Sequence, residues 1–257
     1  MIDPLYVVLG ACVGFVVGLT GVGGGALMTP ALVMLFGVHP MTAVGTDLLY
    51  AALTKSAGSL VHGLRNNVAW GVVALLAGGS VPASIITLLL FADFAAHGGE
   101  TSSVITLILG IALLLTAIAL FFRSWLLRRR EIGRPLSARA SAWLTVFVGA
   151  FLGVAVSISS VGAGAIGVTA LILLYPRYSM VKIVGTDIAH AVPLALVAGA
   201  GHWLTSSINV AMLVSLLVGS VPSIMLGSYL APRLPETGLR YLLAFVLTIV
   251  GVRLIVA

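Results

Sequence analysis

The sequence predicts an all-α polytopic membrane protein built from two repeats of opposite membrane topology. Three observations lead to this fold class: an apolar composition, a pattern that returns at a fixed offset, and the placement of basic residues between apolar segments. Only 8% of the 257 residues are charged and 60% are hydrophobic, whereas soluble domains contain about 25% charged residues. Apolar runs long enough to cross ~30 Å of hydrocarbon as helix fill most of the chain, and the alternation of an outer-membrane barrel is absent.

The chain repeats itself at an offset of 139 to 140 residues, so that Gly10 corresponds to Gly149 and Gly14 to Gly153. The motif Val-Gly-Thr-Asp at 44–47 returns at 184–187. A chance match would not keep one offset across glycines, an acid and a proline. We therefore expect a first repeat at 1–122, a basic linker at 123–140 and a second repeat at 141–257.

Each repeat is expected to begin with a helical hairpin that is broken by glycine. Residues 5–20 and 24–37 are each too short for a comfortable span, and the sequence Thr-Gly-Val-Gly-Gly-Gly at 20–25 is the poorest helix former in the chain. Residues 142–158 and 163–175 repeat this pattern. Unwound backbone at membrane depth is tolerated only where protein buries it or water reaches it. Each break is therefore a candidate cavity wall.

Three full helical spans follow each hairpin. We expect them at 42–61, 68–92 and 103–122 in the first repeat, and at 183–204, 209–231 and 239–257 in the second. Basic loops stay on the cytoplasmic side of a membrane. Placing Arg65, the linker arginines, Arg177, Lys182 and Arg233 inside requires an odd number of crossings in each half.

An odd number of crossings inverts the second repeat relative to the first, an architecture typical of secondary transporters. The alternative makes each broken stretch one long span, which gives eight spans and parallel repeats and places Arg177 and Lys182 outside. In the inverted arrangement the linker is cytoplasmic and both termini lie outside. Much of the net charge of +6 comes from the linker, which indicates a cytoplasmic anchor and no nucleic-acid partner.

One acid lies inside an apolar helix of each repeat, at Asp47 and Asp187, about one turn from the expected helix start. An ionised carboxylate at the bilayer centre costs ~3 kcal/mol on insertion scales, so each acid needs a proton, a cation or a helix N-terminus. We interpret both as coupling sites, with Thr46 and Thr186 beside them and His190 as a proton relay. The alternative is that Thr46 and Asp47 only cap the first helical turn.

Lys55 lies two turns beyond Asp47, and its counterpart in the second repeat is Ala195. A cation without a partner there attracts an anion, so Lys55 is a candidate substrate-binding residue. The alternative is a lysine that snorkels or pairs with one of the acids. His62 and His202 lie near helix ends and are expected at the membrane interface.

The two glycine breaks are the best candidate anion sites. A helix that begins at a break presents free backbone N–H groups and the positive end of its dipole, and nearby hydroxyls add donors. The alternative is that the glycines only allow close helix packing, as expected for Gly10 and Gly14. The candidate substrate-binding residues at the breaks are Thr20, Gly21, Gly23, Gly24, Gly25, Ser159, Ser160, Gly162 and Gly164.

No catalytic residue, cofactor or metal site is expected. Residues 162–167 fit the pattern G-x-G-x-x-G, but without a preceding strand or a βαβ unit the match is accidental. The glycines of the first repeat lack the Gly-Lys-Ser/Thr ending of a P-loop. Asp187 and His190 alone fall at ligand spacing, which is a weak metal signal.

Five features of the sequence are found together in one known family: the 20–25 motif with Pro30, the pairs Gly45-Thr46 and Gly185-Thr186, the turn from Gly63 to Trp70, and Gly162-Ala163-Gly164. Through them the sequence resembles the TauE/SafE sulfite exporter family over nearly the whole chain. The resemblance implies a carrier in the bacterial inner membrane that exports sulfite or organosulfonates. Many members have Ser or Asn where this chain has Asp47 and Asp187, which implies a distinct subgroup.

The leading interpretation is a secondary transporter, not an enzyme, that exports a small sulfur-containing anion and is coupled to H⁺ or Na⁺. It would contact membrane lipid, and a homodimer is compatible with it. The breaks bind the anion, Lys55 adds positive charge, and Asp47 and Asp187 take up the coupling ion. Two alternatives remain: an intramembrane aspartyl hydrolase with both acids within hydrogen-bond reach, and an anion channel, which would conduct without saturation.

Overall fold

The computed structural model describes residues 2–20, 24–97, 101–130, 137–204, 208–230 and 236–256. Within these ranges the chain forms ten α-helices and no β-strand, which confirms the all-α class. The helices are α1 (Pro4–Thr20), α2 (Gly25–Phe36), α3 (Pro40–Leu64), α4 (Trp70–Ala96), α5 (Thr101–Arg130), α6 (Ala138–Ser159), α7 (Ala165–Leu174), α8 (Met180–Leu204), α9 (Val210–Leu230) and α10 (Glu236–Val256).

Five stretches of the described chain are long and apolar enough to cross a membrane: Trp70–Phe94, Ser103–Arg123, Ala138–Ser159, Met180–Leu204 and Val210–Gly227. Large apolar side chains are exposed all along these helices, as expected of surfaces that face lipid. The chain is therefore a multi-pass membrane protein.

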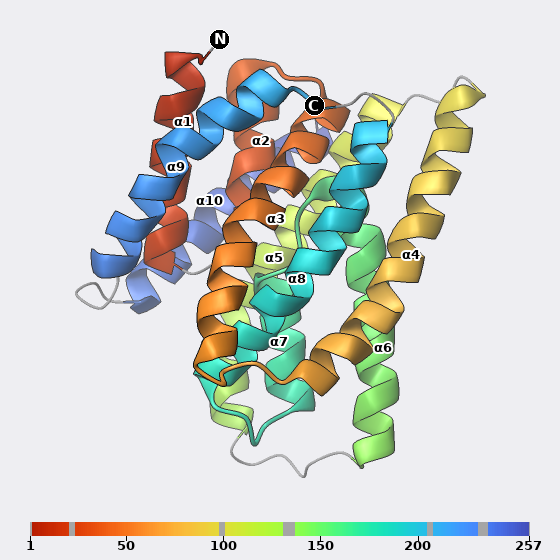
Figure 1. Ribbon diagram of the computed structural model, residues 1–257, viewed down its shortest axis with the longest axis vertical. Helices are drawn as coiled ribbons and strands as arrows, with labels where there is room; N and C mark the ends of the chain where they lie inside the picture. The colour runs from red at the N-terminus through yellow and green to blue at the C-terminus, as the bar shows by residue number, and fades with distance from the viewer. Residues whose placement is uncertain are drawn as a thin grey trace.

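Each half begins with a pair of helices separated at a glycine-rich break, close to the bounds expected from the sequence. In Figure 1, α1 begins at the top beside the N-terminus, whereas α6 begins at the bottom. α6 starts four residues earlier than expected, at Ala138, because Ser137 accepts a hydrogen bond from the N–H of Ala140 at 3.2 Å. Its 22 residues make α6 long enough to cross a membrane by itself.

The helices continue into the linker expected at 123–140. α5 extends to Arg130 and α6 begins at Ala138, because leucine and arginine are both good helix formers. Residues 131–136 of this range lie outside the described chain. Three places lie at the bottom of Figure 1: the connection between α3 and α4, the connection between α7 and α8, and the facing ends of α5 and α6. Both termini lie at the top.

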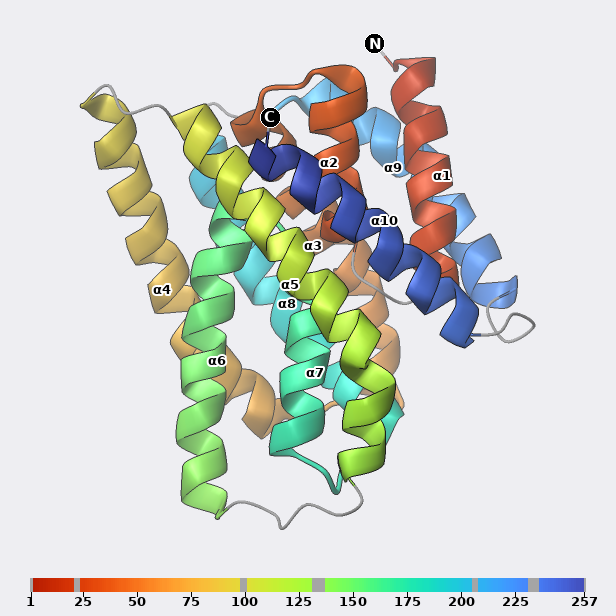
Figure 2. The ribbon, with the colours of Figure 1, turned by 180° about the vertical axis from the view of Figure 1, so that it is seen from behind.

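Helices from the two halves pack against each other in matching pairs. α1 lies along α9 and α6 along α4, while α3 packs on α8 and α5 on α10, as Figure 2 shows for the last pair. A Cβ added to Gly10 would overlap the backbone of Leu216 on α9, and one added to Gly149 would overlap Leu76 on α4. The packing role expected for these glycines is confirmed.

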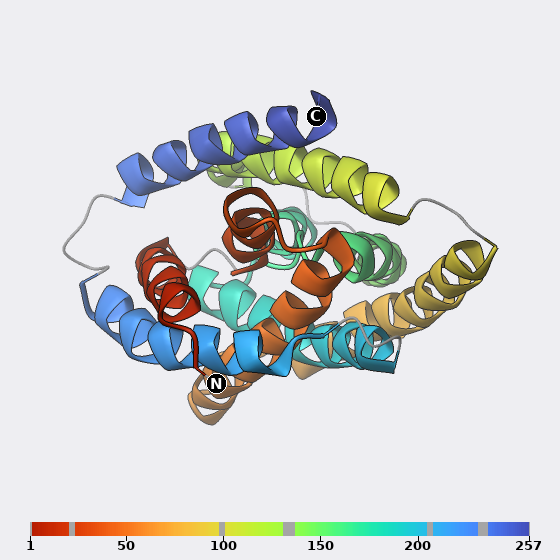
Figure 3. The ribbon, with the colours of Figure 1, turned by 90° about the horizontal axis from the view of Figure 1, so that it is seen from above.

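The short helices α2 and α7 lie at the centre of the molecule. Seen from above in Figure 3, they are enclosed between the α5–α10 pair and the α3–α8 pair. Ala26 at the start of α2 and Ala165 at the start of α7 share one buried cluster with Val161 and with side chains of α5 and α10. Protein therefore surrounds the described parts of both breaks.

Candidate anion-binding and coupling site

The two helix breaks are in direct contact. Gly25 begins α2, and a Cβ added to it would overlap the backbone carbonyl of Ser160, which ends α6. Gly24 lies against the ring of Tyr50 on α3. Only glycine at position 25 allows this approach. The candidate residues outside the described part of the chain are Gly21 and Gly23, together with the side chain of Thr20.

The second break is built from backbone in the left-handed region. Ser160 has φ 57°, Gly162 has φ 121° and Gly164 has φ 125°, values that glycine adopts without cost. A serine at positive φ is uncommon, and such strain concentrates at functional sites. The N–H of Val161, just after the helix, donates to the hydroxyl of Ser159 at 3.2 Å, so Ser159 helps to end α6.

Both α2 and α7 begin at these breaks without a side-chain cap. Their N-cap residues are Gly24 and Gly164, neither of which has a side chain that can accept a hydrogen bond from the first turn. The third N–H group of each helix is already bonded, Leu27 to the carbonyl of Gly24 at 2.9 Å and Gly167 to that of Gly162 at 3.3 Å. The first two N–H groups of each helix and the positive end of its dipole lie at the contact between the breaks. This arrangement is suited to an anion.

Asp47 and Asp187 each lie seven residues after the first residue of their helix, Pro40 in α3 and Met180 in α8. Proline at the first helical position starts α3 at residue 40, two residues before the expected start at 42. The interpretation of Asp47 as a first-turn cap is therefore wrong. Both side chains are buried, with exposed fractions of 0% and 2%.

The carboxyl group of Asp47, on α3, lies beside residues that follow or form both breaks. Thr29 on α2 donates its hydroxyl to Oδ2 of Asp47 at 2.6 Å. The hydroxyl of Ser160 lies beside the same carboxyl without a hydrogen bond of ordinary geometry, and Oδ1 of Asp47 has no hydrogen-bond partner among the described residues. Nothing in the sequence singles out Thr29, because a buried threonine is common in any helix.

Asp187 occupies the matching place at the start of α7, with a different environment. A Cβ added to Gly167 would overlap Oδ1 of Asp187, and this oxygen has no hydrogen-bond partner in the described chain. The counterpart of Thr29 in the second repeat is Val168. Asp187 therefore lacks the hydroxyl donor that Asp47 has.

Lys55 places a positive charge between the two acids. Its Nζ lies 3.4 Å from the carbonyl oxygen of Ala163 in the second break, and it is within Coulombic range of both Asp187 and Asp47. A lysine of the first repeat thus contacts the break of the second. Among the described residues Lys55 forms no ion pair within 4.0 Å with either acid, so direct pairing does not occupy its charge.

Thr46 and Thr186 use their hydroxyls to hold helix ends of the opposite half. Thr186 accepts a hydrogen bond from the N–H of Ala69, directly before α4, at 2.9 Å. Thr46 accepts one from the N–H of Asn209, directly before α9, at 3.4 Å. Both threonines neighbour the acids in sequence but contact backbone.

The buried histidines lie on α8. His190 is fully buried and its Nε2 lies 2.9 Å from Oγ of Ser80 on α4. His202 is 3% exposed and its Nε2 lies 2.9 Å from the carbonyl of Ser157. His202 lies near the end of α8, as expected, and it is buried there because a glycine on α3 leaves room for its side chain. His62 is partly buried.

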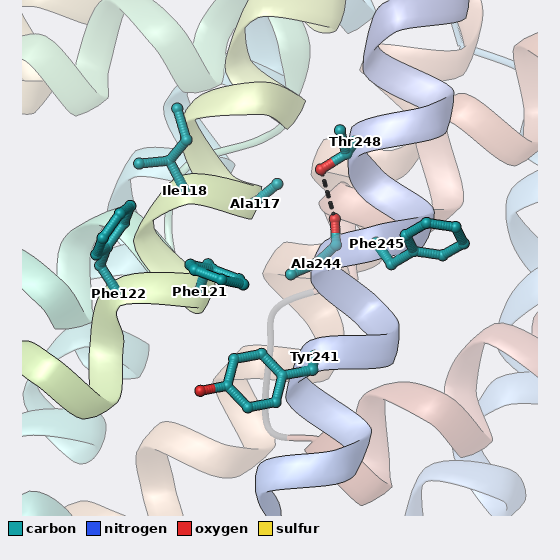
Figure 4. Close-up of a pocket in the computed structure, with 8 residues that line it drawn as sticks. All are labelled: Ala117, Ile118, Phe121, Phe122, Tyr241, Ala244, Phe245 and Thr248. Carbon is teal, nitrogen blue, oxygen red and sulfur yellow. Dashed lines mark hydrogen bonds between the residues drawn. The ribbon is translucent and has the colours of Figure 1, made fainter.

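Two cavities in the described part of the chain lie apart from the breaks, in addition to a smaller one of about 390 Å³ between α3 and α8. One of about 490 Å³ is on the outer face between α5 and α10, where Figure 4 shows Phe121, Phe122 and Tyr241 among its lining side chains; it is apolar, as expected of a surface in contact with lipid tails. The other, of about 610 Å³, is lined by Arg177 and Lys182 with residues of α4 and α6. It is positively charged and lies at the basic end of the molecule.

The sequence profile described as "Sulfite exporter TauE/SafE" matches residues 6–254. "Probable membrane transporter protein YjnA" of Bacillus subtilis (strain 168) is 36% identical over 97% of this chain and 98% of its own length. "Probable membrane transporter protein YdhB" of the same strain is 25% identical over 94% and 96% of the two chains. No solved structure matches the chain. The chain therefore belongs to the sulfite exporter TauE/SafE family and is a membrane transporter, not an enzyme.

Proposed function

We propose that the protein is a secondary transporter that exports a small sulfur-containing anion, sulfite or an organosulfonate, coupled to H⁺ or Na⁺. The observation that carries the proposal is the contact between the two helix breaks. There the uncapped starts of α2 and α7 lie beside one lysine and two buried acids. The family description names sulfite, an anion whose oxygens suit such amides.

The anion binds at the first-turn amides of α2 and α7, which begin at Gly25 and Ala165. The hydroxyl of Ser160 is buried and has no hydrogen-bond partner in the described chain, so it is available as a further donor. Lys55 supplies the positive charge. The remaining candidate substrate-binding residues are Thr20, Gly21, Gly23, Gly24, Ser159, Gly162 and Gly164.

Asp47 and Asp187 take up the coupling cation. An unpaired carboxylate in a membrane is costly, and each of these acids has one oxygen without a hydrogen-bond partner among the described residues. A bound cation and a bound anion at adjacent sites stabilise each other, and this reciprocity is what couples their movement. His190, one turn after Asp187, relays protons to it, while Thr46 and Thr186 hold the helices that carry the acids.

The halves 1–122 and 141–257 act as inverted repeats. The opposite directions of α1 and α6 and the matched helix pairs support this arrangement. With basic connections in the cytoplasm, the linker 123–140 is cytoplasmic and both termini are periplasmic, in a bacterial inner membrane. Rocking of one repeat against the other opens the central site to alternate sides, and the cavity at Arg177 and Lys182 attracts the anion on the cytoplasmic side.

The test is flux of radiolabelled sulfite in proteoliposomes, with and without a pH or Na⁺ gradient. We expect saturable transport that one gradient stimulates. Asp47→Asn and Asp187→Asn should each lower the stimulated rate at least tenfold, whereas Asp93→Asn, which changes an exposed carboxylate on α4, should not. Stimulation that survives in both variants rules out the coupling role, and conductance without saturation favours a channel.

A further inference from the structure

The cavity at Arg177 and Lys182 lies where three membrane-spanning helices begin. It has a volume of about 610 Å³ and is lined by the first turns of α4 and α6, by the connection from α7 to α8 and by the start of α8. The spans that begin there are Trp70–Phe94, Ala138–Ser159 and Met180–Leu204. The cavity therefore lies at the depth where the headgroups of a membrane meet its hydrocarbon.

Aromatic side chains mark the same depth. Trp70 at the start of α4 is 59% exposed, and Trp143 in the second turn of α6 is 69% exposed. Tryptophan and tyrosine gather at the headgroup level, because their rings are apolar and their N–H or O–H groups are polar. Tyr175 and Tyr178 line the cavity and stack with 5.3 Å between ring centroids. A lipid headgroup of the adjacent leaflet therefore lies level with the cavity.

The charged groups of the cavity are both positive. Arg177 and Lys182 line it, and none of its described lining residues is acidic. Neither side chain forms an ion pair with an acid in the part of the chain that the structure describes. The positive ends of the α4, α6 and α8 dipoles add to this charge. The cavity therefore favours an anion.

Contacts within the cavity wall hold its groups in place. Nζ of Lys182 lies 5.1 Å from the centre of the Tyr178 ring, a cation–π distance. The hydroxyl of Tyr175 lies 2.8 Å from Oγ1 of Thr145, which joins the connection to α6. Arg177 is exposed, and its planar guanidinium can bind two oxygens of one phosphate. A wall with preformed contacts lowers the cost of ordering side chains around a ligand.

The opposite end of the molecule lacks these charges, although the repeat gives it corresponding elements. At the offset of 140 residues, Lys182 corresponds to Thr42. The connection between α2 and α3, residues 37–39, contains no arginine or lysine, whereas that between α7 and α8 contains Arg177. The fold therefore does not require the two cations. The preference of basic loops for the cytoplasm is met by charges anywhere on a connection; here both line one cavity.

We propose that this cavity binds the phosphodiester headgroup of an anionic lipid, such as phosphatidylglycerol, from the adjacent leaflet. The cavity volume lies in the range of about 300–1,000 Å³ that holds organic ligands, and it is larger than a small inorganic anion fills. Basic pockets between transmembrane helices are suited to lipid headgroups. The phosphate oxygens bind Arg177 and Lys182. The acyl chains lie along exposed apolar side chains of the same helices, such as Phe147 on α6 and Leu89 on α4.

The lipid site goes beyond the transport function and does not depend on which solute is transported. A phosphodiester carries one negative charge, so Arg177 and Lys182 keep a net positive charge that still attracts an anion from the cytoplasm. The cavity wall combines α4 of the first half with α6 and α8 of the second. A bound headgroup therefore stabilises the contact between the two halves.

The test measures the melting temperature of the purified protein in detergent with added phosphatidylglycerol. Phosphatidylcholine is the reference lipid, because it has the same phosphate and a compensating ammonium, and inorganic phosphate tests a free anion. Arg177→Gln, Lys182→Gln and the double variant remove the cations, whereas Lys182→Arg keeps the charge. Arg65→Gln is the matched control, because it removes an exposed cation from the same end of the molecule that does not line the cavity.

We expect phosphatidylglycerol to raise the melting temperature of the unmodified protein, of Lys182→Arg and of Arg65→Gln by about 5 °C relative to phosphatidylcholine, as for a ligand well above its Kd. Each glutamine variant of the cavity should lose at least half of this shift, and the double variant should lose all of it. Each shift is taken from the melting temperature of the same variant in phosphatidylcholine, so a general loss of stability does not imitate the result.

Three results overturn the lipid site. They are a shift in the double variant equal to that of the unmodified protein, an equal loss of the shift in Arg65→Gln, and an equal shift caused by inorganic phosphate alone, which identifies a site for a free anion. The measurement contains neither sulfite nor an ion gradient. Its failure therefore leaves the proposed transport function standing.

Discussion

At the residue scale, Gly25 allows the two helix breaks to contact each other because it has no side chain. A Cβ there would overlap the carbonyl of Ser160, so Gly25→Ala should push the two breaks apart. Overpacking of this kind costs ~1–3 kcal/mol. We expect sulfite transport to fall at least tenfold in the alanine variant, measured in proteoliposomes at equal protein density.

The control for this substitution is Gly78→Ala. Gly78 lies within α4 with no atom within 4 Å of an added Cβ. Alanine is favoured over glycine inside a helix by ~0.5–1 kcal/mol, so this variant should transport normally and unfold at an equal or higher temperature. Normal transport in Gly25→Ala would show that the contact between the breaks is not needed.

The chemistry of single residues was only partly readable from the sequence. Asp47, Asp187 and Lys55 stand out because charges inside apolar helices are rare, and the structure brings these three side chains within Coulombic range. The contact of Thr29 with Asp47 depends on how α2 turns back onto α3, which residue types alone do not encode. The burial of His202 could not be predicted for the same reason, since it depends on a glycine of another helix.

At the scale of elements, Thr186 shows how one half holds the helices of the other. Its hydroxyl accepts the N–H of Ala69 before α4 at 2.9 Å. Thr186→Val keeps the shape and leaves that N–H without its acceptor, which costs ~1 kcal/mol or more. We expect the melting temperature in detergent to fall by roughly 2–4 °C, a shift typical of chains of this size.

Thr46→Val supplies the comparison within the same chain. Its contact with the N–H of Asn209 is longer, at 3.4 Å, so the melting temperature should fall less. A larger loss for Thr46→Val than for Thr186→Val would contradict the assignment of these hydroxyls to helix ends.

Helix bounds follow from the sequence at the two glycine-rich breaks. The breaks after α1 and α6 were expected within a few residues, because glycine runs cannot continue a helix. The end of α5 at Arg130 lies beyond the expected bound, because a run of charged residues indicates a loop although arginine is a good helix former. Hydropathy indicates where a segment leaves the lipid, but it does not indicate where the helix itself ends.

At the scale of the whole molecule, the inverted arrangement predicts which connections meet the cytoplasm. In a background with Cys12→Ala, single cysteines at Leu64, Ser179 and His97 place one probe at each of three exposed positions. A membrane-impermeant maleimide applied to intact cells should label only position 97. Inverted vesicles should give labelling at positions 64 and 179. Labelling of positions 64 and 97 from the same side would contradict the single crossing of α4.

The pairing of α1 with α9 and of α6 with α4 also governs how the chain is made. When α1 leaves the ribosome, the helix on which it packs is still some two hundred residues from being synthesised. The first hairpin therefore stays in the bilayer without its partner helix α9 until translation is nearly complete. Neither half assembles alone, so final closure of the protein is a late event in biogenesis, and severed halves regain activity only when a cell produces both together.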